Sequence, residues 1–475
     1  MDQAVGAAAV AQTGKLSSGK RPNILYVILE DSGPNQACYG EPLVRTPNLD
    51  RFAAQGIRFN SAYTTGPVCS AARSALMTGC YQNRIGAHQH RTWNWHKQAL
   101  PAPTRHICEW FRDAGYFTCN LQPAEAPKKK GNPRANLHGA GGAGKIDVNF
   151  FLNAPDKSKF FEGTDWNQRQ PDQPFFAHIT IMETHKGEGW KIARDKPKSE
   201  LVDPEKVKLA AYYPDSAIAR DEYANYLDAI HLSDGYVGQL LARLDADGLR
   251  DNTVVVISSD HGPLFRGKQF LYDGGIHIPL LIRFPHGQGA GTVDDRFVSA
   301  IDFAPTLLGF GGIRTPAGAM QGHDIFAPAS PARDHVFAAR DRMDISIDRM
   351  RAVRTRQYKY IRNYYPAIPY MQHNPYKEGA YPTWNLVKEL HQQGKLNREQ
   401  ALFAAAVKPV EELYDVQADP DEVRNLALHP ARHETLQKLR ALVDAFVREN
   451  DAAYAAEDAL DVYRGYYGRL PEETA

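Results

Sequence analysis

Hydrophobic residues in the first 300 positions occur in short runs that are separated by longer amphipathic segments. Residues 23–29, 174–181 and 253–258 are mostly apolar, which is typical of strands buried on both faces of a parallel sheet. Helices are predicted over 46–56, where a capping threonine and a proline begin the segment and a glycine ends it, and over 222–249, where apolar residues recur on one side. Strands that alternate with helices predict an α/β fold, with a large mixed and mostly parallel sheet and helices on both faces.

The pattern changes after about residue 335. Three short segments rich in arginine and tyrosine, at 335–339, 347–354 and 358–363, predict strands, and a helix is predicted over 433–453. This order predicts a smaller α+β subdomain with an antiparallel sheet. We therefore divide the chain into a flexible leader (1–20), a large α/β domain (21–335) and a C-terminal α+β subdomain (336–475).

Composition and charge exclude several classes of protein. The 56 lysines and arginines are balanced by 55 aspartates and glutamates, which excludes a general nucleic-acid-binding protein and a polybasic membrane protein. No apolar run approaches the roughly 20 residues that a membrane-spanning helix needs. The five cysteines leave at least one thiol unpaired. Residues 1–20 hold no intact signal peptide, although a trimmed export signal would leave the same trace.

Acidic residues and histidines follow three of the predicted strands. Glu30 and Asp31 end the first strand, His185 lies just beyond the second, and Asp260 and His261 end the third. The carboxyl ends of parallel strands meet at one edge of a sheet, where open α/β folds bind their ligands. Hard oxygen donors from several strand ends suit Ca²⁺ or Mg²⁺. Taken singly, each pair also fits an ordinary turn or helix cap.

The segment 66–79 contains a turn that leads into a helix, with Cys69 near the start of the helix and Arg73 one turn later on the same face. A helix N-terminus and a nearby guanidinium both stabilise an oxyanion. On this chemistry alone, Cys69 is either a nucleophile with a low pKa or a small buried residue that covers the helix start.

These residues also carry a resemblance to a family. Cys69-Ser-Ala-Ala-Arg73, followed by Leu76-Met-Thr-Gly79, resembles the type I sulfatase signature C-x-P-S/A-R-x-x-x-L-x-T-G, with Ala71 where proline is usual. Arg21-Pro-Asn-Ile-Leu25 and Ser259-Asp-His-Gly262 resemble the opening strand and the later metal motif of the family. The stretches 166–185, 340–363 and 412–425 resemble its glycan-sulfatase branch, which includes heparan N-sulfatase.

The resemblance implies an alkaline-phosphatase-like fold and two cofactors. In the family, a formylglycine-generating enzyme oxidises the signature cysteine to formylglycine, so this enzyme is the implied maturation partner of Cys69. The implied Ca²⁺ ligands are Glu30, Asp31, Asp260, His261 and the modified Cys69.

The resemblance also places the lysine of the sulfate site. Lys145-Ile-Asp-Val-Asn-Phe150 resembles the K-T-D-Y-N-F stretch of the heparan N-sulfatase branch, so we assign this role to Lys145. We interpret Lys128, Lys129 and Lys130, within the glycine-rich insertion before it, as a solvated charge run.

The implied reaction is hydrolysis of a sulfate ester or N-sulfate through the hydrated aldehyde of formylglycine. Arg73, Lys145 and Lys268 would offset the sulfuryl charge, and His185 would protonate the departing oxygen. Asp147 or a nearby histidine would act as the base.

Substrate contacts are predicted just beyond the nucleophile helix. His88, His90 and Arg91, followed by Trp93 and Trp95, suit a sulfated or carboxylated sugar at a pocket rim, and a purely structural loop is the alternative. We add Asp147 to this substrate-binding group.

We expect a sulfatase that acts on a sulfated oligosaccharide or polysaccharide in the periplasm or outside the cell. Two alternatives remain: a phosphonate monoester hydrolase or phosphodiesterase of the same superfamily, and a catalytically silent glycan-binding homologue.

Overall fold

The computed structural model describes residues 20–92, 97–121, 144–154, 159–452, 461, 462 and 464. Its larger sheet has seven strands in the order β3-β4-β1-β5-β6-β2-β7. In this sheet only β6 runs antiparallel to its neighbours, so the prediction of a mixed, mostly parallel sheet is confirmed. The strands are β1 (Asn23–Leu29), β2 (Ile57–Tyr63), β3 (Phe117–Asn120), β4 (Phe175–Ile181), β5 (Thr253–Ser259), β6 (His277–Arg283) and β7 (Thr292–Ser299).

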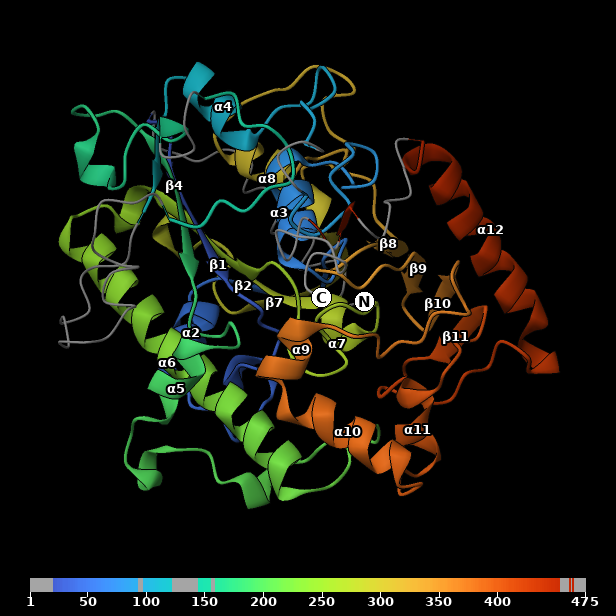
Figure 1. Cartoon of the computed structure of the whole chain (residues 1–475). Helices are drawn as coiled ribbons and strands as arrows, with labels where there is room; N and C mark the ends of the chain where they lie inside the picture. Colours follow the sequence, from blue (N-terminus) through green and yellow to red (C-terminus); the bar gives the residue numbers. More distant parts are fainter. Residues whose placement is uncertain are drawn as a thin grey trace, which may run out of the picture.

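Helices cover both faces of this sheet because alternate side chains of its buried strands enter two different cores. On β1, Tyr26 packs in a core with α3, α4 and α8, whereas Val27 packs on the opposite face with α2 and α6. Figure 1 shows these two groups of helices on the two sides of the sheet. The helices of the larger unit are α2 (Pro47–Ala54), α3 (Cys69–Thr78), α4 (Ile107–Asp113), α5 (Glu188–Arg194), α6 (Ala217–Ala246), α7 (Asp273–Ile276) and α8 (Phe303–Phe310).

A separate four-stranded antiparallel sheet, in the order β11-β10-β9-β8, forms the C-terminal part and confirms the second element of the predicted fold. One face packs against α12, which lies along the outside of the molecule in Figure 1. The other face shares a core with residues of the larger unit, so the boundary near residue 335 stays a prediction. The elements are β8 (His335–Arg340), β9 (Met350–Thr355), β10 (Tyr358–Asn363), β11 (Glu411–Asp415), α9 (Pro375–Ala380), α10 (Pro382–Gln392), α11 (Arg398–Ala404) and α12 (His433–Asn450).

Two predicted helices differ from those observed. The helix predicted over 222–249 begins at Ala217, because the Ser216 side chain accepts a hydrogen bond from the amide of Ala219 and caps it. Thr46 precedes α2 but does not cap it through its side chain. The carboxylate of Asp234, from α6, instead accepts hydrogen bonds from the first free amides of α2, including that of Leu49 at 2.8 Å.

Some sequence predictions lie outside the described residues. They concern most of the leader, the glycine-rich insertion with Lys128, Lys129 and Lys130, and the tryptophans at positions 93 and 95.

The second sheet is fixed partly by buried charge, which gives a test of stability. Arg351 is fully buried and binds Asp341 at 3.1 Å and Asp451 at 2.8 Å. Arg351→Met should lower the free energy of unfolding by about 3–5 kcal/mol, because it leaves the buried carboxylate of Asp341 without its cation and removes one of the two arginines that pair with Asp451. Urea denaturation measures this change. Lys191→Met, which removes a largely exposed ion pair with Glu188, serves as the control and should stay within about 0.5 kcal/mol. Equal effects of the two changes would contradict the assignment.

Candidate active site

The three predicted strand ends meet. In the register of the large sheet, Leu29 is level with Ile181 of β4 and with Ser259 of β5, so the residues that follow each strand lie together. The amide of Asp31 donates a hydrogen bond of 3.0 Å to the carboxylate of Asp260 and ties two of the ends directly. The sharp turn after β1 puts Asp31 at a φ of 48°. The turn interpretation of these motifs is therefore correct locally, and the turns also deliver a cluster of ligands.

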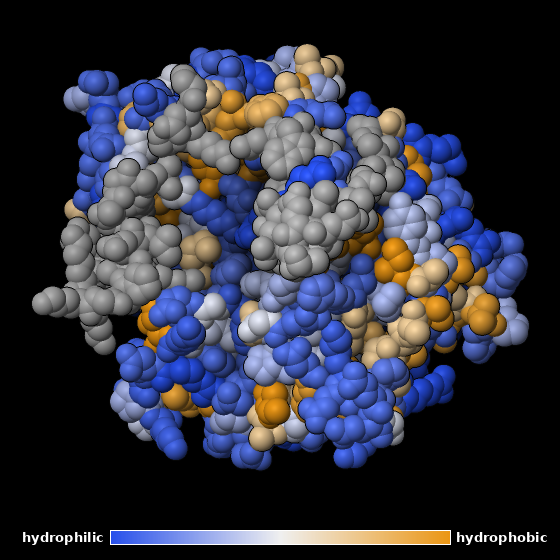
Figure 2. Space-filling model, viewed as in Figure 1, coloured by the Kyte–Doolittle hydropathy of each residue, from blue (hydrophilic) through white to orange (hydrophobic). Residues whose placement is uncertain are grey.

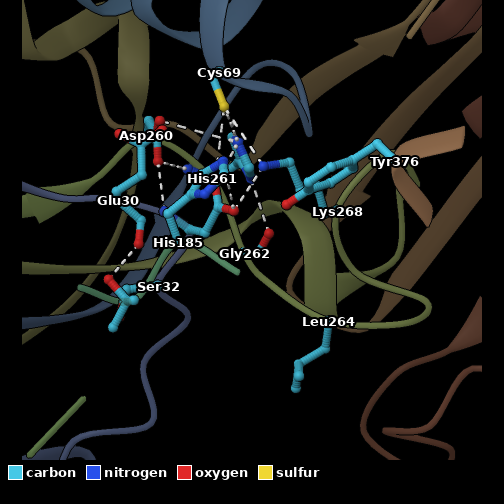
Figure 3. Close-up of polar contacts among 12 residues, drawn as sticks. Glu30, Ser32, Cys69, His185, Asp260, His261, Gly262, Leu264, Lys268 and Tyr376 are labelled. Atoms are coloured by element: carbon cyan, nitrogen blue, oxygen red, sulfur yellow. Dashed lines mark hydrogen bonds and ion pairs between the residues drawn. The ribbon is translucent and has the colours of Figure 1, made fainter. Parts of the chain in front are cut away.

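Cys69 is the first residue of α3 and is 1% exposed. Its Sγ lies 3.3 Å from His261 Nε2, 3.7 Å from Lys268 Nζ and 3.8 Å from Asp31 Oδ1. Figure 3 shows the sulfur pointing toward His261 and Lys268. Burial raises the pKa of the Cys69 thiol, and this outweighs the opposing effect of the nearby lysines. The raised pKa argues against a thiolate nucleophile at Cys69. The polar contacts of its sulfur argue against a residue that only fills the core.

Arg73 lies one helical turn after Cys69 and is fully buried. Its guanidinium forms ion pairs with Glu30 and, at 3.1 Å, with Asp260, and it donates a hydrogen bond of 3.1 Å to the Thr180 hydroxyl. Burial lowers the pKa of Arg73, but the two carboxylates raise it further, so the side chain remains charged. Arg73 thus connects α3 with the ends of β1, β4 and β5.

Two lysines complete the positive side of the site. Lys145 forms an ion pair with Glu30 and lies 3.3 Å from Asp147, and Lys268 binds Asp31 at 2.6 Å. Burial raises the pKa of the Asp31 carboxyl, but the charge of Lys268 and of two histidines more than offsets this and holds the pKa below its ordinary value. The predicted catalytic lysines therefore do reach the strand ends.

His185 lies at the open edge of the cluster, with 18% of its side chain exposed and Nε2 3.9 Å from Asp31. Burial, followed by the charge of Lys268, lowers the pKa of His185 to about 4. The ring of Tyr376, from α9, lies 6.0 Å from the ring of His185 and 5.2 Å from Lys268 Nζ. The same helix carries Lys377, whose Nζ donates to the carbonyl of Leu264 at 3.0 Å in the loop before Lys268.

The donor set fits a divalent cation. Two groups of potential ligands, Glu30 with His185 and Asp260 with His261, share Asp31 and Cys69. His261 Nδ1 lies 2.8 Å from the carbonyl of Gly262, which places the ring proton there and leaves the Nε2 lone pair facing Asp31 Oδ1 at 3.2 Å. A lone pair aimed at a carboxylate oxygen needs a cation between them, either a proton or a metal. Burial lowers the pKa of His261, but Asp260 and Asp31 raise it to about 9.

The predicted substrate-binding residues border this cluster to different degrees. His88 and His90 are buried, and His90 Nδ1 pairs with Asp344 at 3.2 Å. Arg91 is exposed, and its amide donates a hydrogen bond of 2.8 Å to the hydroxyl of Ser70, the neighbour of Cys69. Asp147 pairs with Lys145, and about a fifth of its side chain is exposed to solvent.

Three residues of the site were missed in the sequence. Thr180 is the penultimate residue of β4 and lies inside the predicted strand, where a threonine is an ordinary strand residue and gives no sign of a role in the site. Asp344 and Tyr376 come from the C-terminal part, more than 270 residues after Cys69 in the chain. Nothing in their local sequence marks them, because only the packing of the two sheets brings them here.

None of the described helices combines the length and the apolar character that crossing a bilayer requires. Comparison with family models gives two matches. Residues 22–313 match the sulfatase model, and residues 260–377 match the model of the N-sulphoglucosamine sulphohydrolase C-terminal region.

Comparisons with individual proteins agree with these matches. The chain is 32% identical to an ulvan-active sulfatase of Formosa agariphila, over 91% of this chain and 76% of the relative. It is 25% identical to the N-sulphoglucosamine sulphohydrolase of Homo sapiens, over 88% of each chain. A solved structure described as a complex with its substrate D-glucosamine-2-N,6-O-disulfate has a TM-score of 0.58 and 19% identity, over 92% of this chain and all of the other, which shows a shared fold. The family model covers well over half of the chain, and the chain therefore belongs to the sulfatase family of sulfuric ester hydrolases.

Proposed function

We propose that this sulfatase removes sulfate from a sulfated carbohydrate, with formylglycine derived from Cys69 as nucleophile and Ca²⁺ as metal. The observation that carries the proposal is the position of Cys69. Its sulfur lies within 4 Å of a carboxylate, an imidazole and a lysine that belong to different segments. A formylglycine at this position would supply a hydrated aldehyde whose hydroxyl attacks the sulfur of the substrate.

The metal ligands that we propose are Asp31, Asp260, Glu30 and His261, together with the modified residue 69. Carboxylate oxygens are the ligands that Ca²⁺ prefers. His261 Nδ1 donates to the Gly262 carbonyl, so Nε2 is the nitrogen that would bind the cation after losing its proton. Bound Ca²⁺ would polarise a sulfate oxygen and neutralise part of its charge.

The cationic side chains have separate roles in this proposal. Arg73 is held by two carboxylates and fixes the strand ends and the nucleophile helix relative to one another. Lys145 pairs with Glu30 and Lys268 pairs with Asp31, and both lysines would bind the sulfuryl oxygens. Preorganised cations in a buried site stabilise developing negative charge without a reorganisation cost.

His185 is the proposed donor of a proton to the departing oxygen or nitrogen. Burial and Lys268 hold its pKa at about 4, and the negative charge of a bound sulfate would raise this pKa and favour the protonated form. Its side chain is 18% exposed, about as accessible as those of Lys145 and Asp147, whereas Asp31 and Lys268 beside it are almost fully buried. A leaving group that exits on this side of the site would pass His185. Tyr376 lies against the same ring and forms a wall of this exit.

A carbohydrate substrate is supported by the relatives and by the surface. The matched relatives are named for ulvan and for N-sulphoglucosamine. The face in Figure 2 is predominantly hydrophilic, with apolar residues in small separate groups, which suits a polar chain rather than an apolar ligand. We further propose that a formylglycine-generating enzyme matures the protein, and that the mature enzyme works in the periplasm or outside the cell, where sulfated polysaccharides occur.

A second candidate activity is hydrolysis of phosphonate monoesters or phosphodiesters. It is favoured by His261, because the metal motif then reads Asp-His rather than the Asp-Asn pair that most sulfatases carry. Rates on an aryl sulfate and on an aryl phosphonate monoester, measured with one enzyme preparation, distinguish the two activities.

The first prediction concerns the nucleophile. Cys69→Ala should abolish desulfation while the melting temperature stays nearly unchanged, because the residue serves the reaction. Cys80→Ala is the matched control: Cys80 is equally buried beyond the end of the same helix, and its replacement should preserve turnover. Peptide mass spectrometry after co-expression with a formylglycine-generating enzyme should find the aldehyde at residue 69 alone. Full activity in protein shown to be unmodified would refute this mechanism.

The second prediction concerns the metal. Chelation of metal-loaded protein should lower both activity and melting temperature, because a ligand bound only to the native state stabilises it by about 2.7 kcal/mol at a hundred times its dissociation constant. Differential scanning fluorimetry with EGTA, followed by added Ca²⁺, measures the shift. In Asp31→Asn the shift should disappear. Identical melting curves with and without chelator would contradict the proposal.

The third prediction separates Lys145 from the lysines of the insertion. Lys145→Ala should lower kcat by at least about a hundredfold, since a charge-assisted hydrogen bond in the transition state contributes roughly 2–4 kcal/mol. Joint replacement of Lys128, Lys129 and Lys130 by alanine should leave kcat within a few-fold. Steady-state kinetics decides between them, and the reverse pattern would assign the sulfate-binding role to the insertion.

A further inference from the structure

Arg91 is a cation at the rim of the site that the proposed reaction does not use. Its side chain is exposed, and within the described part of the chain its guanidinium has no ion pair or hydrogen-bond partner. The cations assigned to the scissile sulfate differ from it, because the side chains of Arg73 and Lys268 are at most 2% exposed and that of Lys145 is 17% exposed. An acidic group that binds the exposed Arg91 would therefore differ from the sulfate that those buried cations would bind.

The backbone that carries Arg91 is held on three sides. The Arg91 amide donates to Ser70 on the nucleophile helix, the His90 amide donates to the carbonyl of Arg342 at 3.0 Å, and the Thr92 amide donates to the side chain of Asn149 at 3.1 Å. Arg91 itself has a φ of 50°, a left-handed conformation that is uncommon for a residue other than glycine. These contacts hold the backbone of Arg91 beside Ser70, the neighbour of Cys69.

The carboxylates nearest to Arg91 already have other partners. Asp147 lies 3.3 Å from Lys145, and Asp344 lies 3.2 Å from His90. Burial lowers the pKa of Arg91, but Cys69, Asp147 and Asp344 raise it further, so the guanidinium is charged. Among the described residues no carboxylate forms an ion pair with it. The Arg91 guanidinium is therefore available to an acidic group of a ligand.

We propose that Arg91 binds a second acidic group of the substrate, so that the enzyme prefers sulfated sugars that carry a carboxylate or another sulfate close to the sulfate that is removed. This inference rests on the proposed function and adds the class of sugar. Guanidinium pairs with both groups through two parallel hydrogen bonds. Because the Arg91 amide bonds to Ser70, the residue after Cys69, the two acidic groups would belong to the same sugar or to adjacent sugars.

The experiment uses three sulfated disaccharides that differ in one substituent: a neutral neighbour, a uronic acid neighbour and a neighbour with a second sulfate. Arg91→Gln should lower kcat/KM by roughly 10- to 100-fold for one or both acidic substrates and by less than about twofold for the neutral one. Arg91→Lys should lie between, because it keeps the charge but loses the fork. The acidic substrate that suffers the larger loss identifies the group that is bound. Arg84→Gln, an exposed arginine of the same segment, is the matched control and should leave all three rates unchanged.

Equal losses on the neutral and acidic substrates, or no loss on any of them, would overturn the inference. Calorimetric binding of the same disaccharides to Cys69→Ala protein, with and without Arg91→Gln, gives a second readout that needs no turnover. If the wild-type enzyme desulfates none of the three but the acidic ones still bind through Arg91, the proposed reaction fails while the role of Arg91 stands. Binding that does not depend on residue 91 would overturn the role of Arg91.

Discussion

The structure depends on the pairing of buried charges at one edge of the large sheet. Glu30, Asp31 and Asp260 are almost fully excluded from solvent, and ionised groups at such positions persist only when cations face them. Arg73 meets two of the three carboxylates and Lys268 meets the third. The same contacts that make the ionised carboxylates tolerable also fix the nucleophile helix on the strand ends, so the stability and the chemistry of this region share their residues.

The elements of the large sheet were largely predictable because local sequence determines them. The apolar run of β1 and that of β4 appear within one residue of the predicted bounds, since a strand buried on both faces needs continuous hydrophobicity. The start of α2 was less predictable. Its first amides are satisfied by Asp234, almost 190 residues later, and no local pattern reports a cap that comes from another helix. Helix ends depend on such distant partners more than helix cores do.

The residues of the candidate site also divide into those that local sequence predicts and those that depend on distant parts of the chain. Strand-end residues such as Asp31 and Asp260 could be placed together from the sequence, because parallel strands bring their carboxyl ends to one edge. Lys145 could be placed only through resemblance to a family, since nothing in its own spacing points to Glu30. Asp344 and Tyr376 could not be found, because they reach the rim through the packing of the second sheet on the first.

The packing of the two sheets gives them different roles in the candidate site. The groups assigned to bond cleavage all come from the first sheet and the segments around it, whereas the second part contributes Tyr376 beside the exit and Asp344 behind the rim. Lys377 joins the two through the carbonyl of Leu264. Substitutions in the later third of the chain can therefore reshape the surroundings of Tyr376 and Asp344 without replacing any residue of the charged cluster at the strand ends. The charged cluster and part of its rim are thus built by separate stretches of the chain.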